Sequence, residues 1–173
     1  MGTHNNFKHF DRLGQNLLIS FISFNTYHDN STDEYGFYDA SGTTKTNKKV
    51  LFELKCNDSK QDSFPTSIIT KADFDKILSQ TPEDVAPFYV TFTNNQTNII
   101  NLRKIADDPE VYFIKEVRNK ISEMGNEVYR YEDWVYINRL QARKKGYLKR
   151  LFKGGLKAGI DIDGELRNRK KWG

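Results

Sequence analysis

The sequence predicts an α/β domain built around a mixed β-sheet. Apolar residues recur at intervals of three and four in residues 7–21, which is the spacing of an amphipathic helix. Residues 35–40 and 50–56 are short apolar runs bounded by turn-forming residues, as expected of strands. The segments that follow continue the order helix, strand, strand, helix, strand, strand, which is typical of α/β folds.

The two strands after the first helix are expected to pair as a hairpin. Residues 27–34 are polar and predict a loop in front of the first strand, 35–40. The connection over residues 41–49 is rich in turn formers and contains Gly42. The chain is therefore expected to turn back there and enter the second strand, 50–56.

A second helix is predicted to begin at residues 70–73, whose sequence Thr-Lys-Ala-Asp resembles a capping box with Asp in its last place. Phe74, Ile77 and Leu78 follow at helical spacing, as expected of the apolar face of this helix. Residues 88–93 then predict a strand, and residues 98–102 are expected to pair back onto it as a hairpin.

The last third of the chain predicts a helix over residues 111–122 and a strand over residues 134–138. Residues 139–150 are strongly basic and predict a further helix, which a glycine pair at 154–155 interrupts. We therefore expect the chain to end in a basic helical arm.

Charge is distributed unevenly along the chain. Residues 1–138 carry 15 Lys and Arg against 20 Asp and Glu, whereas residues 139–173 carry 12 against 3. This pattern predicts a core domain over 1–138 and a basic C-terminal extension over 139–173. A basic extension of this kind usually approaches a polyanion, either nucleic acid or an anionic membrane, and an alternative interpretation is a solvated tail. The charge pattern favours nucleic acid as the partner.

The composition argues against a membrane protein and against a disulfide framework. The longest apolar stretch, residues 17–24, contains Ser20 and Ser23 and is too short to span a bilayer. Cys56 is the single cysteine, so neither an internal disulfide nor a cysteine-based zinc site is available. With no signal sequence visible at the start of the chain, we expect an intracellular protein without a membrane partner.

Three charged residues lie in segments that are otherwise expected to be strands. Glu53 and Lys55 share one face of the strand 50–56, because side chains alternate between faces. Asp39 closes the preceding strand, and it could lie beside Glu53 across the hairpin. Charges on a buried strand need a partner. One interpretation is an internal ion pair, and another is an all-oxygen site for Mg²⁺ that supports phosphodiester hydrolysis.

The spacing of 14 positions from Asp39 to Glu53-Leu54-Lys55 within an apolar strand resembles the PD-(D/E)xK nuclease superfamily. The expected order of helices and strands is similar to that superfamily over roughly residues 7–102. The resemblance implies a restriction-endonuclease-like fold with an α-β-β-α-β-β core and cleavage of DNA that requires Mg²⁺ or Mn²⁺. It assigns Asp39, Glu53 and the Leu54 carbonyl as metal ligands and Lys55 as the catalytic lysine.

The first helix departs from a pattern found in several branches of that superfamily, which place an additional glutamate ligand there. This helix carries Gln15 and Asp11 instead. Asp33 and Glu34, in the loop before the first strand, are further candidates to complete a metal site. The number of metal ions therefore stays open at the level of sequence.

Basic residues are the candidates for contact with the DNA backbone. In this superfamily a Lys or Gln near the start of the second helix sometimes contacts phosphate, which points to Lys71, although an exposed lysine without that role is an equal interpretation. The remaining candidates lie in the C-terminal basic cluster: Arg143, Lys144, Lys145, Lys149 and Arg150.

These observations predict a metal-dependent DNA endonuclease or nickase. A second hypothesis is a DNA-binding or assembly protein that keeps the fold but does not cut, and a third is a structural protein with an internal ion pair. The resemblance leaves a homodimer open, because many members of the superfamily cut both strands as dimers.

Overall fold

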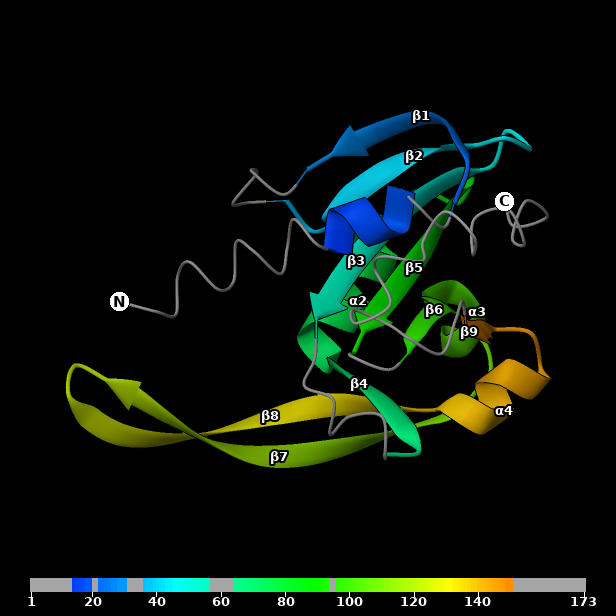
Figure 1. Cartoon of the computed structure of the whole chain (residues 1–173). Coiled ribbons are helices and arrows are strands. Elements are labelled where there is room, and N and C mark those ends of the chain that lie inside the picture. The colour runs from blue at the N-terminus through cyan, green and yellow to red at the C-terminus, as the bar shows by residue number, and fades with distance from the viewer. Residues whose placement is uncertain (1–13, 20–21, 31–35, 57–63, 94–95, 151–173) are drawn as a thin grey trace.

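The computed structural model describes residues 14–19, 22–30, 36–56, 64–93 and 96–150 (Figure 1). Residues 14–19 are helical. The strands are β1 (Phe24–Asp29), β2 (Ala40–Thr44), β3 (Lys49–Cys56), β4 (Thr66–Thr70), β5 (Val85–Phe92), β6 (Thr97–Asn101), β7 (Tyr112–Glu123), β8 (Asn126–Asn138) and β9 (Leu148–Arg150). The further helices are α2 (Lys71–Gln80), α3 (Leu102–Ala106) and α4 (Arg139–Lys144).

The strands form two sheets, which confirms the predicted α/β class and the mixed sheet. The larger sheet has six strands in the order β1-β2-β3-β5-β6-β9, and the smaller has three in the order β4-β8-β7. β3 and β5 are parallel, and every other pair is antiparallel. A parallel pair needs a crossover, and β4 and α2 provide it between the end of β3 and the start of β5.

α2 begins and ends at side chains that bond its free backbone groups. Thr70 is the N-cap, and its hydroxyl accepts a hydrogen bond from the Asp73 amide at 3.2 Å. The predicted helix is confirmed: Phe74 and Ile77 are buried, and Leu78 is partly buried against the same core. Within the part of the chain that the structure describes, no helix is long and apolar enough to cross a membrane.

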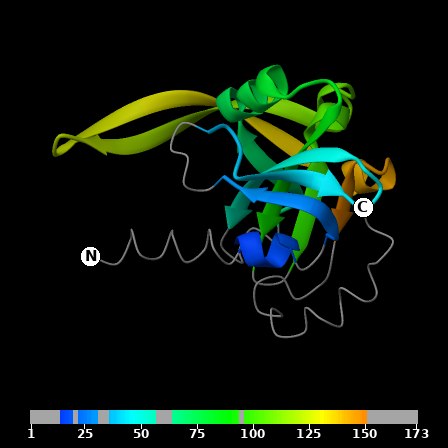
Figure 2. The ribbon, with the colours of Figure 1, turned by 90° about the horizontal axis from the view of Figure 1, so that it is seen from above.

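The six-stranded sheet has a hydrophobic core on each face. Leu17 and Leu18 of the first helical segment pack on one face together with residues such as Phe52 and Val90. α2 and the three-stranded sheet cover the other face, where Leu51 and Tyr89 are buried. Figure 2 shows the two helices on opposite sides of the sheet. The central strands β3, β5 and β6 therefore alternate between two buried faces rather than between core and solvent.

β7 and β8 form a long hairpin that projects away from the rest of the molecule (Figures 1 and 2). Its turn places Met124 and Gly125 at φ values of 50° and 81°, the left-handed conformation that tight hairpin turns need. The expected helix over 111–122 is wrong. Val111, Ile114 and Val117 recur at three-residue intervals, which suggests a helix, but pairing with β8 along the whole length of β7 decides the conformation.

The expected strand over residues 35–40 is also wrong in its position. The strand that pairs with β3 is β2, which lies in the segment expected to be a turn, and Asp39 directly precedes it. β1, which covers part of the expected loop 27–34, pairs with the other edge of β2. The small polar side chains of β2 look turn-like in sequence, but they suit a strand that lies between two close neighbours.

The first part of the expected C-terminal extension belongs to the folded core. The expected helix over 139–150 ends at Lys144, because Gly146 turns the chain at φ 80° and β9 then pairs with β6. Ala142 and Leu148 are buried in the same cluster as the core strands. Residues 139–150 are therefore not a separate arm, and the Gly154–Gly155 break and the rest of the expected extension lie outside the described residues.

Gly42 is required by the close approach of β1. A Cβ atom built on Gly42 would lie 2.3 Å from the backbone oxygen of Thr26 and 3.1 Å from the Phe24 ring. We predict that Gly42→Ala lowers the free energy of unfolding by about 1–3 kcal/mol, because β1 must move to make room. Chemical denaturation measures this change, and Ser41→Ala on the same strand is the control, expected within about 0.5 kcal/mol of the parent. Equal effects of the two substitutions would contradict the prediction.

Candidate functional site

Asp39 lies where β3 continues beyond the start of β2. Its amide donates to the Phe52 carbonyl at 2.8 Å and so extends the β2–β3 ladder by one residue. Its side chain then takes the place of the next backbone partner, because Oδ2 accepts a hydrogen bond from the Leu54 amide at 2.7 Å. The predicted closeness of Asp39 to the segment Glu53–Leu54 is therefore present in the structure.

The Leu54 carbonyl faces the same side of β3 as the Leu54 amide. In an antiparallel ladder, the amide and carbonyl of one residue point toward the same neighbouring strand. Because the Leu54 amide reaches the Asp39 carboxylate, the carbonyl of Leu54 points toward the edge of β3 that Asp39 occupies. The Leu54 carbonyl oxygen thus lies on the same side of β3 as Asp39, as expected if both are ligands of one metal ion.

Glu53 is half-buried beside Asp39, on the face of the sheet that α2 covers. It is the direct neighbour of the buried Tyr89 on β5, and the Tyr89 hydroxyl donates to the Ile68 carbonyl at 3.0 Å. Burial raises the pKa of Glu53 to about 8, and the carboxylates of Asp39 and Asp73 act in the same direction. Lys55 lowers this pKa, but its effect is smaller than those of burial and of the two acids.

These opposing effects on the pKa of Glu53 argue against an internal ion pair as the reason that a glutamate occupies this position. A salt bridge that stabilised the Glu53 carboxylate would lower its pKa. The pKa is instead raised, and Lys55 itself is exposed. The side chain of Glu53 therefore lies near a site that is short of positive charge.

Two further residues of the site come from α2 and were missed in the sequence. Asp73 and Lys76 both act on the pKa of Glu53, Asp73 raising it and Lys76 lowering it. They directly precede the buried Phe74 and Ile77, so they lie on the helix stripe next to the buried face. The same three-residue spacing was visible in the sequence, but Asp73 was interpreted only as a capping residue.

Gln15 reaches this site from the first helical segment. It is buried, its Nε2 donates to the Asp39 backbone oxygen at 2.9 Å, and its Oε1 accepts a hydrogen bond from the Tyr27 hydroxyl. Both ends of the amide are therefore engaged, and Gln15 positions Asp39. The other candidates to complete a metal site, Asp11, Asp33 and Glu34, lie outside the described residues.

The oxygen donors of this site suit a single magnesium ion better than a metal ion that must be coordinated entirely by protein groups. Mg²⁺ keeps several waters and is held by one or two carboxylates together with substrate phosphates. Asp39, Glu53 and the Leu54 carbonyl supply hard oxygen donors of this kind. Within the described ranges, no group of three or more His, Cys, Asp or Glu side chains could hold a metal ion.

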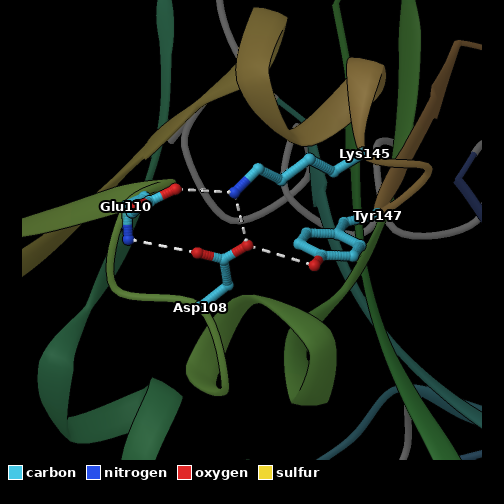
Figure 3. A network of polar contacts seen from close by, with 4 residues as sticks. All are labelled: Asp108, Glu110, Lys145 and Tyr147. Atoms are coloured by element: carbon cyan, nitrogen blue, oxygen red, sulfur yellow. Dashed lines mark hydrogen bonds and ion pairs between the residues drawn. The ribbon is translucent and has the colours of Figure 1, made fainter.

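Lys145 is held in a network of polar contacts (Figure 3). Its ammonium pairs with Asp108 at 2.8 Å and with Glu110 at 3.0 Å, and the Tyr147 hydroxyl donates to Asp108 at 3.1 Å. The hydrogen bond to Lys145 is the main reason that the pKa of Asp108 is lowered. This network ties the chain after α4 to the chain after α3, so Lys145 has a structural task.

The other predicted DNA contacts lie in different places. Lys71, at the start of α2, forms an ion pair with Asp75. Arg143 and Lys144 are exposed in the last turn of α4. Lys149 and Arg150 lie on β9 opposite Ile99 and Asn98 of β6. The structure therefore brings part of the predicted cluster to one edge of the large sheet and separates Lys71 from it.

The comparisons with known proteins identify no relative. No protein-family model matches the chain, and a search of curated proteins gives no match.

The raised pKa of Glu53 predicts a pH-dependent stability. The folded state binds the Glu53 proton more tightly than the unfolded chain, whose glutamate has the ordinary value of 4.5. The stabilisation is complete below pH 4.5 and is lost as the pH rises through 8. In a metal-free buffer we expect the free energy of unfolding to fall over this range, by at most about 1.4 kcal/mol per pH unit.

Glu53→Gln should remove this dependence, because the amide cannot ionise. The variant should then be more stable than the parent at pH 9, as measured by urea denaturation at several pH values. Glu83→Gln, at an exposed position between α2 and β5, is the control and should follow the parent. Parallel pH curves for the parent and Glu53→Gln would contradict the assignment.

Proposed function

We propose that the protein is a divalent-metal-dependent DNA endonuclease or nickase whose core resembles that of restriction endonucleases. The observation that carries the proposal is the position of the Asp39 carboxylate, 2.7 Å from the Leu54 amide and beside the half-buried Glu53. Asp39 raises the pKa of Glu53, and a cation between the two carboxylates would relieve this repulsion. The hydrogen bond to Leu54 explains the position of Asp39, but the repulsion between the two carboxylates adds no stability to the metal-free fold.

Asp39, Glu53 and the Leu54 carbonyl would hold the ion. A bound Mg²⁺ supplies Lewis acidity toward a phosphate oxygen and lowers the pKa of a bound water. Glu53 must lose its proton to serve as a ligand, so binding of the ion should release a proton below about pH 8. Gln15 supports this arrangement by holding the backbone oxygen of Asp39.

The two lysines near Glu53 supply positive charge for the substrate. Lys55 lies on the same face of β3, two residues beyond Glu53, and is exposed. It can orient an attacking water or neutralise charge that develops on the scissile phosphate. Lys76 reaches the same region from α2, as its effect on the pKa of Glu53 indicates, and could contact a neighbouring phosphate.

DNA is the polyanion that best fits this chemistry. The excess of Lys and Arg over residues 139–173 contrasts with the acidic composition of residues 1–138. Arg143, exposed on α4, would contact phosphates without reading the base sequence. We therefore propose cleavage with little sequence preference, in which backbone contacts at the β9 edge position the duplex.

Relaxation of a supercoiled plasmid in the presence of Mg²⁺ or Mn²⁺ tests the activity directly. The parent should cut, a chelator should stop it, and Glu53→Gln should lower the rate by a factor on the order of 10² or more, because a ligand is lost. Glu83→Gln should cut at the parent rate. Normal cleavage by Glu53→Gln would refute the assignment of the site.

Lys55→Ala should separate catalysis from metal binding. We expect a rate that is lower by a factor on the order of 10² or more, with an Mg²⁺ affinity close to that of the parent. Lys49→Ala is the matched control, because Lys49 lies on the same face of β3 at its other end and pairs with Asp84. Calorimetry measures the affinity and plasmid relaxation the rate. Equal losses of both in Lys55→Ala would assign Lys55 to holding the site together instead.

One observation favours a second function, a DNA-binding or assembly protein that does not cut. The buried side chain reaching Asp39 from the first helical segment is the neutral Gln15, and its amide is hydrogen-bonded at both ends. Retardation of DNA on a gel, with no cleavage in the presence of Mg²⁺ or Mn²⁺, would support this alternative.

A further inference from the structure

A small cavity lies between α4, the β6–β9 edge of the large sheet and the residues that precede β4. Its volume is about 170 Å³, well below that of a pocket for a whole drug-sized ligand. Its basic lining residues are Arg139, Arg143 and Arg150. No carboxylate belongs to the described residues that line it. The cavity is thus small, and its described lining combines apolar side chains with three arginines.

Asn98 provides the second observation. It lies on β6 directly opposite Arg150 of β9, so the two side chains share one face of the sheet. Asn98 is 1% exposed, lines the cavity, and its Nδ2 group donates no hydrogen bond within the described structure. A buried donor without a partner is rare in folded proteins and calls for an explanation. A hydrogen-bond acceptor bound in the cavity would give the Asn98 Nδ2 group its partner.

The wall of the cavity is held in place by contacts that do not involve a ligand. The Arg139 amide donates to the Pro65 carbonyl at 3.0 Å, and the Arg139 guanidinium donates to the Phe64 carbonyl. Asn138 caps α4 by accepting a hydrogen bond from the Gln141 amide at 3.0 Å. The helix that carries Arg143 is therefore fixed against the β4 side before any ligand binds, which lowers the cost of ordering the site.

We infer that this cavity is a binding site for a phosphate group, held by Arg143, Arg150 and Arg139 with the Asn98 amide as an additional donor. A terminal phosphate carries a charge between −1.5 and −2 at neutral pH and three strong acceptor oxygens. Guanidinium groups match those oxygens with paired hydrogen bonds, and a neutral amide donor completes the set. A carboxylate ligand offers fewer oxygens than this number of donors requires.

The phosphate can belong to the free ion or to the end of a nucleic-acid strand. Phe64 is 52% exposed at the rim, where it offers an aromatic face on which a base could stack. The inference does not depend on the proposed cleavage, because neither Glu53 nor Lys55 contributes to the cavity. Phosphate binding can therefore be measured in the presence of a chelator, and the result does not depend on whether the protein cleaves DNA.

The test compares Arg143→Gln with Lys144→Gln. Both remove one positive charge from an exposed position on α4, but only Arg143 lines the cavity. Inorganic phosphate is titrated into each protein at constant ionic strength. Relative to the parent, we expect the dissociation constant to rise at least about tenfold in Arg143→Gln and to stay within about twofold in Lys144→Gln. The Asn98 side-chain amide signals should shift in the parent's nuclear magnetic resonance spectrum.

Paired oligonucleotides distinguish the source of the phosphate. If the 5′-phosphorylated strand binds at least about tenfold more tightly than its 5′-hydroxyl twin, and Arg143→Gln removes the difference, the ligand is a strand end. If the twins bind equally while inorganic phosphate still depends on Arg143, the ligand is the free ion. Either outcome supports the site. Equal weakening by Arg143→Gln and Lys144→Gln, or no dependence of any probe on Arg143, would overturn it.

Discussion

The hydrogen bond from the Leu54 amide to the Asp39 carboxylate is the constraint on which the candidate site depends. β3 is longer than β2, so a backbone amide of β3 would lack a partner at this point. The side chain of Asp39 supplies it at 2.7 Å, and an unsatisfied amide in its place would cost about 1–3 kcal/mol. The same bond places a carboxylate beside Glu53 and contributes to the raised pKa of that residue. One bond thus completes the sheet and builds the like-charge pair.

Apolar side chains give way to polar ones between two neighbouring rows of the large sheet. Glu53, Tyr89, Ile100 and Leu148 lie side by side across β3, β5, β6 and β9, and three of these four side chains are buried and apolar in character. Two residues further along, the row on the same face reads Lys55, Thr91, Asn98 and Arg150. Lys55, two residues from Glu53, and Arg150, at the phosphate cavity, therefore lie at opposite ends of one polar row, roughly three strand spacings of about 4.8 Å apart.

Local signals predicted the parts of the fold in which side-chain pattern and environment agree. β3, α2 and the β5–β6 hairpin have apolar runs, a capping residue and helical spacing that each indicate one structure. β2 and β7 were missed because their conformation is set by neighbouring strands: Gly42 is needed only because Thr26 lies so close, and β7 is extended only because β8 pairs with it. For the same reason the sequence placed Asp39, Glu53 and Lys55 together, but could not identify Asp73, Lys76 or Asn98. Those contacts depend on how α2 and β9 pack on the sheet.

Gln15 links the fold to the charge that the site can hold. Burial and two nearby carboxylates already raise the pKa of Glu53 to about 8. A third acid at the position of Gln15 would raise it further, because like charges disfavour ionisation. The neutral amide avoids this cost while it holds the Asp39 backbone and the Tyr27 hydroxyl in place. Under the proposed function, a site with two carboxylates balances one divalent ion, and the positive charge needed at the scissile phosphate must then come from Lys55 and Lys76.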